Sequence, residues 1–240
     1  MQTSSKLAVR SLDAGYGAVQ ILKEVSISVG AEEIVAVLGP NGSGKSTLVK
    51  SLMGLTTLYA GEIHWDGTNI TRLRPHQRAK EGLGYVPQTE NVFPTLKVQE
   101  NLEIGGFLRQ SEEVSEEIER VYSLFPSLYD RRNVRAGNLS GGERRMLALA
   151  SSLMMGPRCL LLDEPSSDLA PAMIDLVFEK INQIRSDYGI PILMVEQNVP
   201  RAMDIASRLY VLVQGSVRLE ADTGDVTEQE LGDLFLEVTA

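Results

Sequence analysis

The stretch from Gly39 to Thr47, GPNGSGKST, constrains the fold of this chain more than any other feature. It matches the P-loop pattern G-x-x-x-x-G-K-[ST] and directly follows the apolar run Ile34–Leu38. Residues 48–53, LVKSLM, continue it in a pattern that suits a helix. We therefore expect a buried strand that runs into a glycine-rich loop, and a helix that begins at the end of this loop.

Such a loop suits a chain of phosphates. Its glycines lack a Cβ atom, so the backbone can turn tightly and point successive N–H groups at an anion near the positive end of the helix. Lys45 would place its ammonium group between the β- and γ-phosphates, and Ser46 would offer its hydroxyl to Mg²⁺. A glycine turn that merely links strand to helix is the alternative. The predicted nucleotide-binding residues of the loop are Gly39, Pro40, Asn41, Gly42, Ser43, Gly44, Lys45, Ser46 and Thr47.

The composition is that of an ordinary globular protein, with 43% hydrophobic and 23% charged residues among 240. The net charge of −9 argues against nucleic acid as the main partner, because phosphate backbones are bound by an excess of Lys and Arg. The single cysteine, Cys159, excludes an internal disulfide, fits a reducing compartment and lies in an apolar run, where a buried side chain is expected. We find no signal segment and no apolar run that would span a bilayer.

Strand and helix patterns alternate from the P-loop strand onward, which predicts an α/β core with a mostly parallel sheet. Residues 6–38 have β-type patterning and predict an antiparallel β subdomain at the N-terminus, while residues 89–155 predict a helical insertion. Within this insertion we expect an irregular stretch over 89–111, an amphipathic helix over 112–123 and a longer helix over 144–155.

Two further side chains are expected near the phosphate loop. Tyr16 lies in a glycine-flanked turn between the first two predicted strands, where its ring could stack on a base or simply pack on the protein. Gln88 follows the predicted strand GYVP and places a polar amide at its end.

Ser140-Gly-Gly-Glu143 precedes the longer predicted helix of the insertion. Ser140 and Glu143 fit a capping box, which by itself requires no paired glycines. Gly141 and Gly142 remove side chains from a helix N-terminus and leave a positively polarised surface that an anion can approach. A second phosphate-binding element is therefore plausible, and capping can coexist with it.

Asp163 and Glu164 end the apolar run CLLL, which predicts a buried strand. In open parallel sheets ligands bind beyond the carboxyl ends of the strands, so both carboxylates should lie at the edge that carries the P-loop. Asp163 could then contribute to a magnesium site, and Glu164 could orient and deprotonate a water molecule. Two surface acids in a turn are the alternative.

The order of these motifs, with LSGGE at residues 139–143 and LLLDE at residues 160–164, resembles the ATP-binding subunit of ABC transporters over essentially the whole chain. LSGGE distinguishes this family from other P-loop proteins, which in general lack it. The resemblance implies a RecA-like P-loop NTPase fold in one nucleotide-binding domain, with ATP and Mg²⁺ as cofactors. Its ATP-binding lobe would comprise residues 1–88 and 156–240, and its helical subdomain residues 89–155.

The resemblance also implies roles for single residues. Tyr16 resembles the aromatic residue that stacks on adenine, and Gln88 the residue that contacts magnesium together with Ser46 and Asp163 and senses the membrane partner. The signature residues Ser140, Gly141 and Gly142 would close on the γ-phosphate held by an opposite subunit. In this family two subunits sandwich two ATP molecules head to tail, so we expect a homodimer or a heterodimer.

Two departures from the usual family pattern narrow the resemblance. Gln197 stands where most members have a histidine, and Ala170 where they commonly have an aspartate. Both features are similar to the ATPases of branched-chain amino acid importers and related amide importers. Gln197 can hydrogen-bond a phosphate oxygen or the attacking water, but it cannot carry a proton at neutral pH, so we assign it a positioning role and keep Glu164 as the base. Lys45 would neutralise charge.

The expected partners are the integral membrane permease subunits of a transporter, with this chain cytoplasmic and peripheral on the inner face of the membrane and without a span of its own. Val92, Phe93 and Leu96 form a candidate groove for a permease helix, unless they are ordinary core residues. The alternatives are a soluble ABC-type ATPase not coupled to transport, acting on nucleic acid or ribosomes; a GTP-dependent switch, for which an Asn-Lys-x-Asp tetrad is missing; and a slow subunit beside a competent partner.

Overall fold

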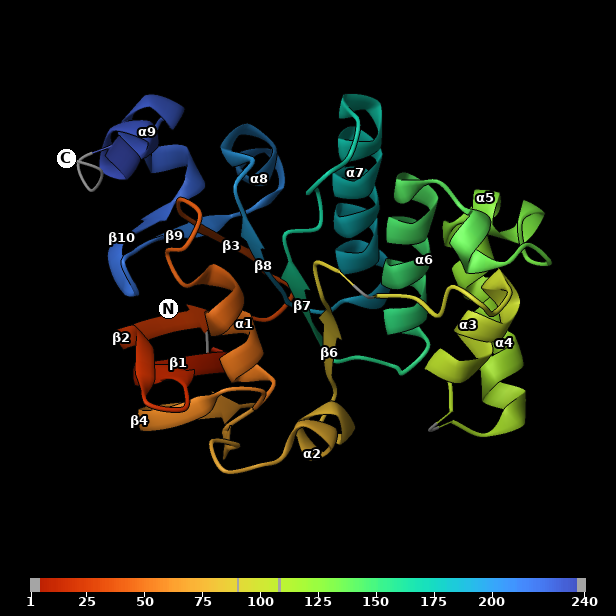
Figure 1. Ribbon diagram of the computed structural model, residues 1–240, viewed down its shortest axis with the longest axis horizontal. Coiled ribbons are helices and arrows are strands. Elements are labelled where there is room, and N and C mark those ends of the chain that lie inside the picture. The colour runs from red at the N-terminus through yellow and green to blue at the C-terminus, as the bar shows by residue number, and fades with distance from the viewer. Residues whose placement is uncertain (1–4, 90, 108, 237–240) are drawn as a thin grey trace.

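Two sheets and a set of helices make up the computed structural model, which describes residues 5–89, 91–107 and 109–236 (Figure 1). The strands are β1 (Leu7–Tyr16), β2 (Val19–Val29), β3 (Ile34–Leu38), β4 (Thr57–Trp65), β5 (Thr68–Asn69), β6 (Leu83–Val86), β7 (Cys159–Asp163), β8 (Ile192–Glu196), β9 (Arg208–Val213) and β10 (Ser216–Asp222). The helices are α1 (Lys45–Leu52), α2 (Pro75–Lys80), α3 (Val98–Gly105), α4 (Ser111–Leu124), α5 (Pro126–Asp130), α6 (Gly141–Leu153), α7 (Pro171–Tyr188), α8 (Val199–Ile205) and α9 (Glu228–Leu236), with 3₁₀ turns η1 (Ala136–Asn138) and η2 (Thr223–Asp225).

The central sheet has the strand order β10-β9-β3-β8-β7-β6. All its neighbouring strands pair in parallel except β10, which forms an antiparallel hairpin with β9. The predicted mostly parallel α/β core is therefore confirmed. The register pairs Leu38 with Glu196 and Asp163 with Val195, so the carboxyl ends of β3, β7 and β8 lie at one edge of the sheet. This edge is where a ligand of an open α/β sheet binds.

The central strands are apolar up to the carboxylates that end β7 and β8, because both faces of the sheet are covered. Along β3, Val35 and Val37 belong to a core shared with α1 and the antiparallel sheet. Ile34, Ala36 and Leu38 belong to a second core, shared with the helices of the other face. The period of two along the strand thus divides one apolar run between two cores and fixes β3 in the middle of the fold.

The antiparallel sheet has the order β2-β1-β4-β5, and α1 packs between it and the central sheet. It confirms the predicted antiparallel β subdomain at the N-terminus, although residues 34–38 form β3 of the central sheet and β4 and β5 complete the antiparallel one. Val25, Ile27 and Val29 are buried while Ser26 is exposed, as expected for a strand with one wet face. Tyr16 was expected in a turn, but it is the last residue of β1 and pairs with Val19 across the hairpin. The turn starts one residue later, because Gly17 supplies the positive φ of 58°.

Helices α3, α4 and α5 lie at the opposite end of the molecule from the antiparallel sheet (Figure 1). The expectation of an irregular stretch over 89–111 was wrong for α3. This helix has only eight residues, too few for a clear period, and side chains fix its start. Glu100 Oε2 accepts a hydrogen bond from the Lys97 backbone N–H at 2.7 Å, and Asn101 Oδ1 accepts one from Phe93 N–H at 2.7 Å. Val98 and Leu102, one turn apart, are fully buried.

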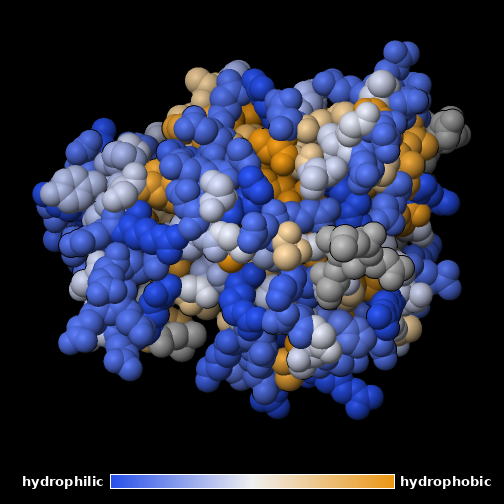
Figure 2. All heavy atoms as spheres, turned by 180° about the vertical axis from the view of Figure 1, so that it is seen from behind, coloured by the Kyte–Doolittle hydropathy of each residue, from blue (hydrophilic) through white to orange (hydrophobic). Residues whose placement is uncertain are grey.

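The surface seen from behind is mainly hydrophilic, with hydrophobic residues gathered in its upper middle (Figure 2). Around α3, the large apolar side chains of Phe93, Ile104 and Phe107 are exposed. Among the described residues, no helix combines the length and apolar character that crossing a bilayer requires.

Candidate functional site

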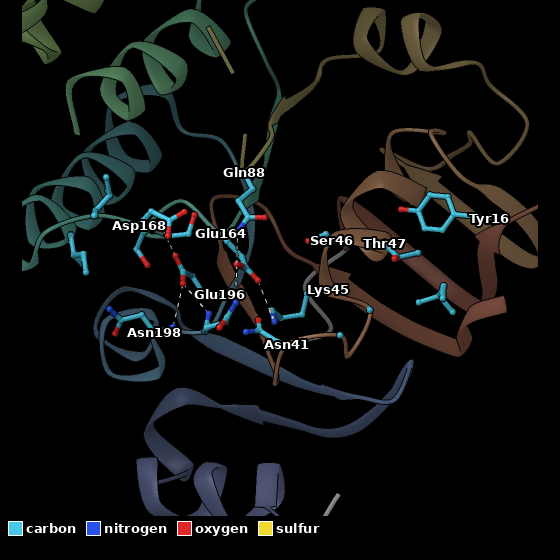
Figure 3. A pocket seen from close by; sticks show the side chains of 18 residues that line it. Tyr16, Asn41, Lys45, Ser46, Thr47, Gln88, Glu164, Asp168, Glu196 and Asn198 are labelled. Atoms are coloured by element: carbon cyan, nitrogen blue, oxygen red, sulfur yellow. Dashed lines mark hydrogen bonds and ion pairs between the residues drawn. The ribbon is translucent and has the colours of Figure 1, made fainter. Parts of the chain in front are cut away.

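A cleft of about 880 Å³ lies at the carboxyl edge of the central sheet (Figure 3). It brings together side chains that are far apart in the sequence, and many of them are predicted site residues. The predicted site residues that line it are Tyr16, Asn41, Gly42, Gly44, Lys45, Ser46, Thr47, Gln88, Glu164 and Gln197. Its other lining residues are Ile21, Ser166, Ser167, Asp168, Leu169, Ile174, Glu196 and Asn198.

The glycines of the phosphate loop are required by its backbone. Gly42 has a φ of 78° and Gly44 a φ of 106°, in a region that L side chains rarely adopt. A Cβ on Gly39 would lie 2.1 Å from the Leu212 carbonyl oxygen, so no side chain fits there. Gly39, Pro40 and Ser43 do not line the cleft; Ser43 is buried, and its carbonyl accepts a hydrogen bond from Gly215 N–H at 2.9 Å.

Lys45 begins α1 and points across the cleft (Figure 3). Its side chain is 3% exposed, and its ammonium group donates hydrogen bonds to the Gly39 carbonyl at 2.9 Å and the Pro40 carbonyl at 3.1 Å. Its Nζ also lies 3.3 Å from Glu164 Oε1. The cation of the P-loop is thus in direct contact with the carboxylate expected to act on water.

Besides Lys45, side chains from two different loops hold Glu164. Gln88 Nε2, after β6, donates to its Oε2 at 3.0 Å, and Gln197 Nε2, after β8, donates to the same oxygen at 2.8 Å. The backbone of Glu164 has a φ of 47°, which is uncommon for a residue with a side chain, and its N–H is bonded to the Val195 carbonyl at 2.9 Å. A carboxylate fixed beside a phosphate loop in this way is suited to general acid–base chemistry.

Asp163, the last residue of β7, is buried and faces the start of α1. Ser46 Oγ donates to its Oδ1 at 2.8 Å and Tyr85 OH donates to its Oδ2 at 3.2 Å. Burial raises the pKa of Asp163, and the hydrogen bond from Ser46 opposes this effect.

These residues fit a magnesium ion. Ser46 and Asp163 are adjacent oxygen donors, and Gln88 lies on the same cleft. Mg²⁺ is usually bound by one or two carboxylates together with substrate phosphates. Within residues 5–89, 91–107 and 109–236 there is no cluster of three or more His, Cys, Asp or Glu that could hold a metal by itself.

Tyr16 projects from the antiparallel sheet on the far side of the P-loop from Glu164 (Figure 3). The residue is 46% exposed and lines the cleft beside Ile21. The ring is therefore not a core side chain, and part of it is open to a planar ligand.

The predicted signature residues are not part of this cleft. Ser140 caps α6, with its Oγ accepting from Glu143 N–H at 3.2 Å and Glu143 Oε2 accepting from Ser140 N–H at 2.8 Å. Ser140 and Gly141 are exposed, as expected for a bare helix end. The same expectation was wrong for Gly142: it is buried, and a Cβ there would lie 2.4 Å from Met173 Cε on α7. A side chain at Gly142 would therefore force the Met173 side chain to move.

Sequence reasoning missed two buried charged residues near Glu164. Glu196 is 1% exposed at the end of β8 and lines the cleft. Arg145, on the buried face of α6, donates from Nη1 to the Pro87 carbonyl at 3.3 Å and from Nη2 to Ser167 Oγ at 3.2 Å. The signal for Glu196 was available, because it ends an apolar strand as Asp163 does.

Comparisons with known proteins agree with this arrangement. Residues 22–167 match the family described as ABC transporter. The chain is 44% identical over 219 residues to a probable branched-chain amino acid transport ATP-binding protein of Archaeoglobus fulgidus, covering 91% of this chain and 93% of the relative. It is 40% identical over 223 residues to a high-affinity branched-chain amino acid transport ATP-binding protein of Pseudomonas aeruginosa, covering 92% and 95%.

More distant similarities cover the chain equally well. A lipopolysaccharide export system ATP-binding protein of Haemophilus influenzae is 33% identical over 216 residues, which are 89% of each chain. A crystal structure of the ADP conformation of an ATP-binding cassette of an ABC transporter superposes with a TM-score of 0.85 at 25% identity, covering 99% of this chain and 98% of that one.

Proposed function

Because this chain belongs to the ABC transporter family of ATP-binding and ATP-hydrolysing proteins, we propose that it powers the import of branched-chain amino acids or related small solutes. One observation carries the assignment of its hydrolysis site: Glu164 lies between the P-loop lysine and two amides, with Lys45 at 3.3 Å and Gln197 at 2.8 Å. The identities of 44% and 40% to ATP-binding proteins of branched-chain amino acid transport support the substrate class.

The protein residues divide the work of hydrolysis. Lys45 and the loop N–H groups neutralise the phosphates, and Glu164 accepts a proton from the attacking water. Gln197 positions Glu164 or that water through hydrogen bonds of its amide. The amide does not ionise at neutral pH, so it does not act as a general acid or base. Ser46, Gln88 and Asp163 would hold the magnesium ion, which when bound neutralises charge on the transferred phosphoryl group.

The working unit is a dimer, homomeric or heteromeric. Tyr16 stacks on adenine, while Ser140 and Gly141 contact the γ-phosphate in the site of the other subunit, and the buried Gly142 supports them from within α6. The exposure of Ser140 and Gly141, outside the chain's own cleft, supports this role. A helix N-terminus is a favourable place for an anion.

The permease subunits dock on the helical part of the chain, residues 89–155, whose movement against the lobe of residues 1–88 and 156–240 transmits the hydrolysis cycle. Exposed Phe93, together with half-buried Val92 and Leu96, supplies apolar contact area after Gln88. The chain would then sit on the inner face of the cell membrane as a peripheral subunit.

Two substitutions test the site. Glu164→Gln keeps the size of the side chain but removes the base, so turnover should fall by about 10² to 10⁴-fold while ATP still binds and the dimer persists. Lys45→Ala should weaken ATP binding itself, because it removes the charge beside the phosphates. Glu179→Gln and Lys80→Ala, at exposed positions on α7 and α2, are the matched controls. Wild-type turnover in Glu164→Gln, or wild-type ATP affinity in Lys45→Ala, would contradict the assignments.

Transport is tested separately. The chain should co-purify with integral membrane subunits. In vesicles, the complex should accumulate branched-chain amino acids on the side of the membrane that carries the ATPase. Efflux instead of uptake would favour an exporter, a possibility supported by the lipopolysaccharide export relative. Recovery with ribosomes or DNA and without membrane subunits would exclude the transport role.

A further inference from the structure

Glu196 is a carboxylate in the wall of the cleft that the proposed mechanism does not use. It is the last residue of β8 and is 1% exposed. Burying a charged group is costly unless hydrogen bonds compensate for the lost water. The contacts of Glu196 therefore indicate what its charge does in this place.

Three backbone N–H groups donate to Glu196 (Figure 3). Ser166 N–H donates to Oε1 at 2.9 Å, while Gln197 N–H and Asn198 N–H donate to Oε2 at 2.9 Å and 3.2 Å. Ser166 belongs to the loop after β7, and Gln197 and Asn198 to the loop after β8. One side chain thus joins the two loops that carry Glu164 and Gln197.

The two loops are linked a second time at Glu164. Ser166 follows Glu164 by two residues, and Gln197 follows Glu196 directly. The second link is the 2.8 Å hydrogen bond from Gln197 Nε2 to Glu164 Oε2. A displacement of either loop would alter the distance between the Gln197 amide and the Glu164 carboxylate.

Only a carboxylate suits the position of Glu196. An ionised carboxylate accepts hydrogen bonds on both oxygens and donates none, which matches three N–H donors. A glutamine would turn its own NH₂ group toward at least one of these donors. Because both oxygens of Glu196 are already occupied by backbone groups, it is also a poor candidate for the base.

Arg145, on α6, also holds the loops around Glu164. It bonds to the loop after β6 through the Pro87 carbonyl and to the loop after β7 through Ser167 Oγ. Burial lowers the pKa of Arg145, and the negative charge of Glu196 opposes this change. A buried cation thus partly balances the charge of Glu196.

We infer that Glu196 is a positioning residue for ATP hydrolysis, which holds Gln197 and the loop after Glu164 at the spacing at which the Gln197 amide reaches the Glu164 carboxylate. The inference rests on the proposed function, in which Glu164 is the base. Glu196 acts through Gln197 and touches no reacting atom.

The test is Glu196→Gln, assayed for turnover per folded molecule and for equilibrium binding of ATP. A misplacement of about 1 Å near the reacting groups can cost about 10² in rate, so we expect a fall in kcat of that order with ATP affinity unchanged. The control is Glu33→Gln, which also removes a bonded carboxylate, the partner of Arg208 at 3.0 Å, but directly before β3. It should lower the melting temperature and leave kcat per folded molecule unchanged.

A double-mutant cycle separates positioning from simple stabilisation. If Glu196 acts through Gln197, then Glu196→Gln combined with Gln197→Ala should lose no more kcat than Gln197→Ala alone. Additive losses, or wild-type kcat per folded molecule in Glu196→Gln, would overturn the inference. Undiminished turnover in Glu164→Gln would instead refute the base assignment, so the two failures are distinguishable.

Discussion

Arg78 offers a stability prediction whose size can be worked out from the structure. The residue is 1% exposed, and its guanidinium lies at the C-terminal end of α1, the helix that follows the P-loop. Nη1 donates to the buried carbonyls of Ser51 at 2.7 Å and Leu52 at 2.8 Å. Nη2 and Nε donate to the carbonyls of Thr71 at 2.7 Å and Leu73 at 3.0 Å.

Arg78→Met keeps a long aliphatic side chain but removes all four donors. Water can reach the half-buried Thr71 and Leu73, so their carbonyls should regain partners. The buried Leu52 carbonyl would be left unpaired, which costs about 1–3 kcal/mol. The Ser51 carbonyl would keep its 3.0 Å hydrogen bond from Gly54 N–H but lose a bond to a charged donor, worth about 1.5–3 kcal/mol. Together with the lost pairing to the negative end of the helix dipole, we expect a loss of about 3–5 kcal/mol.

Thermal unfolding by calorimetry measures this loss. For a chain of this size each kcal/mol lowers Tm by about 2–4 °C, so Arg78→Met should melt about 6–20 °C below the wild type. Burial lowers the pKa of Arg78 to about 10, which leaves the group charged at neutral pH, where the assay is run. Arg74→Met, at an exposed position of the same segment, is the control and should change stability by less than about 0.5 kcal/mol. A change in Arg78→Met as small as that of the control would refute the reasoning.

Three further predictions follow from single contacts. Gln197→His should add an inflection near pH 6.5 to the pH dependence of turnover, because histidine titrates there and the wild-type amide does not; identical profiles would exclude Gln197 from the site. Gly142→Ala should lower Tm because its Cβ would meet Met173 Cε at 2.4 Å, and Met173→Ala in addition should restore part of the loss, whereas a wild-type Tm in the single variant would mean that the Met173 side chain moves aside without cost. Burial raises the pKa of Cys159 to about 12, so below that pH the native thiol should stay protonated and resist alkylation until the protein unfolds; rapid labelling of the native protein at pH 8 would contradict its burial.

The sequence predicted those parts of the fold that depend on uninterrupted local patterns. β3, and β7 and β8 up to their final carboxylates, are apolar because each strand faces two cores, and such runs are visible without knowledge of their partners. The edge at which the P-loop meets Asp163 and Glu164 followed from the geometry of parallel sheets.

The remainder depends on contacts between distant residues. α3 is fixed by Glu100 and Asn101 bonding to backbone groups before the helix, which a search for helical periods does not detect. Gly142 looks like an open helix end in the sequence, but Met173, thirty-one positions later, covers it. The position of Glu196 at the end of an apolar strand was visible, but its role was not, because its three hydrogen bonds come from backbone N–H groups, which the residue types around it do not reveal.

The position of β3 in the central sheet has a consequence for synthesis of the chain on the ribosome. β3 is made early, yet its two neighbours in the sheet, β8 and β9, comprise residues 192–196 and 208–213. The carbonyl of Leu212 packs against Gly39, and Gly215 N–H bonds to Ser43. A nascent chain therefore cannot complete the packing of its phosphate loop until nearly nine-tenths of it has been translated, and a product released before residue 192 would also lack both strands that flank β3.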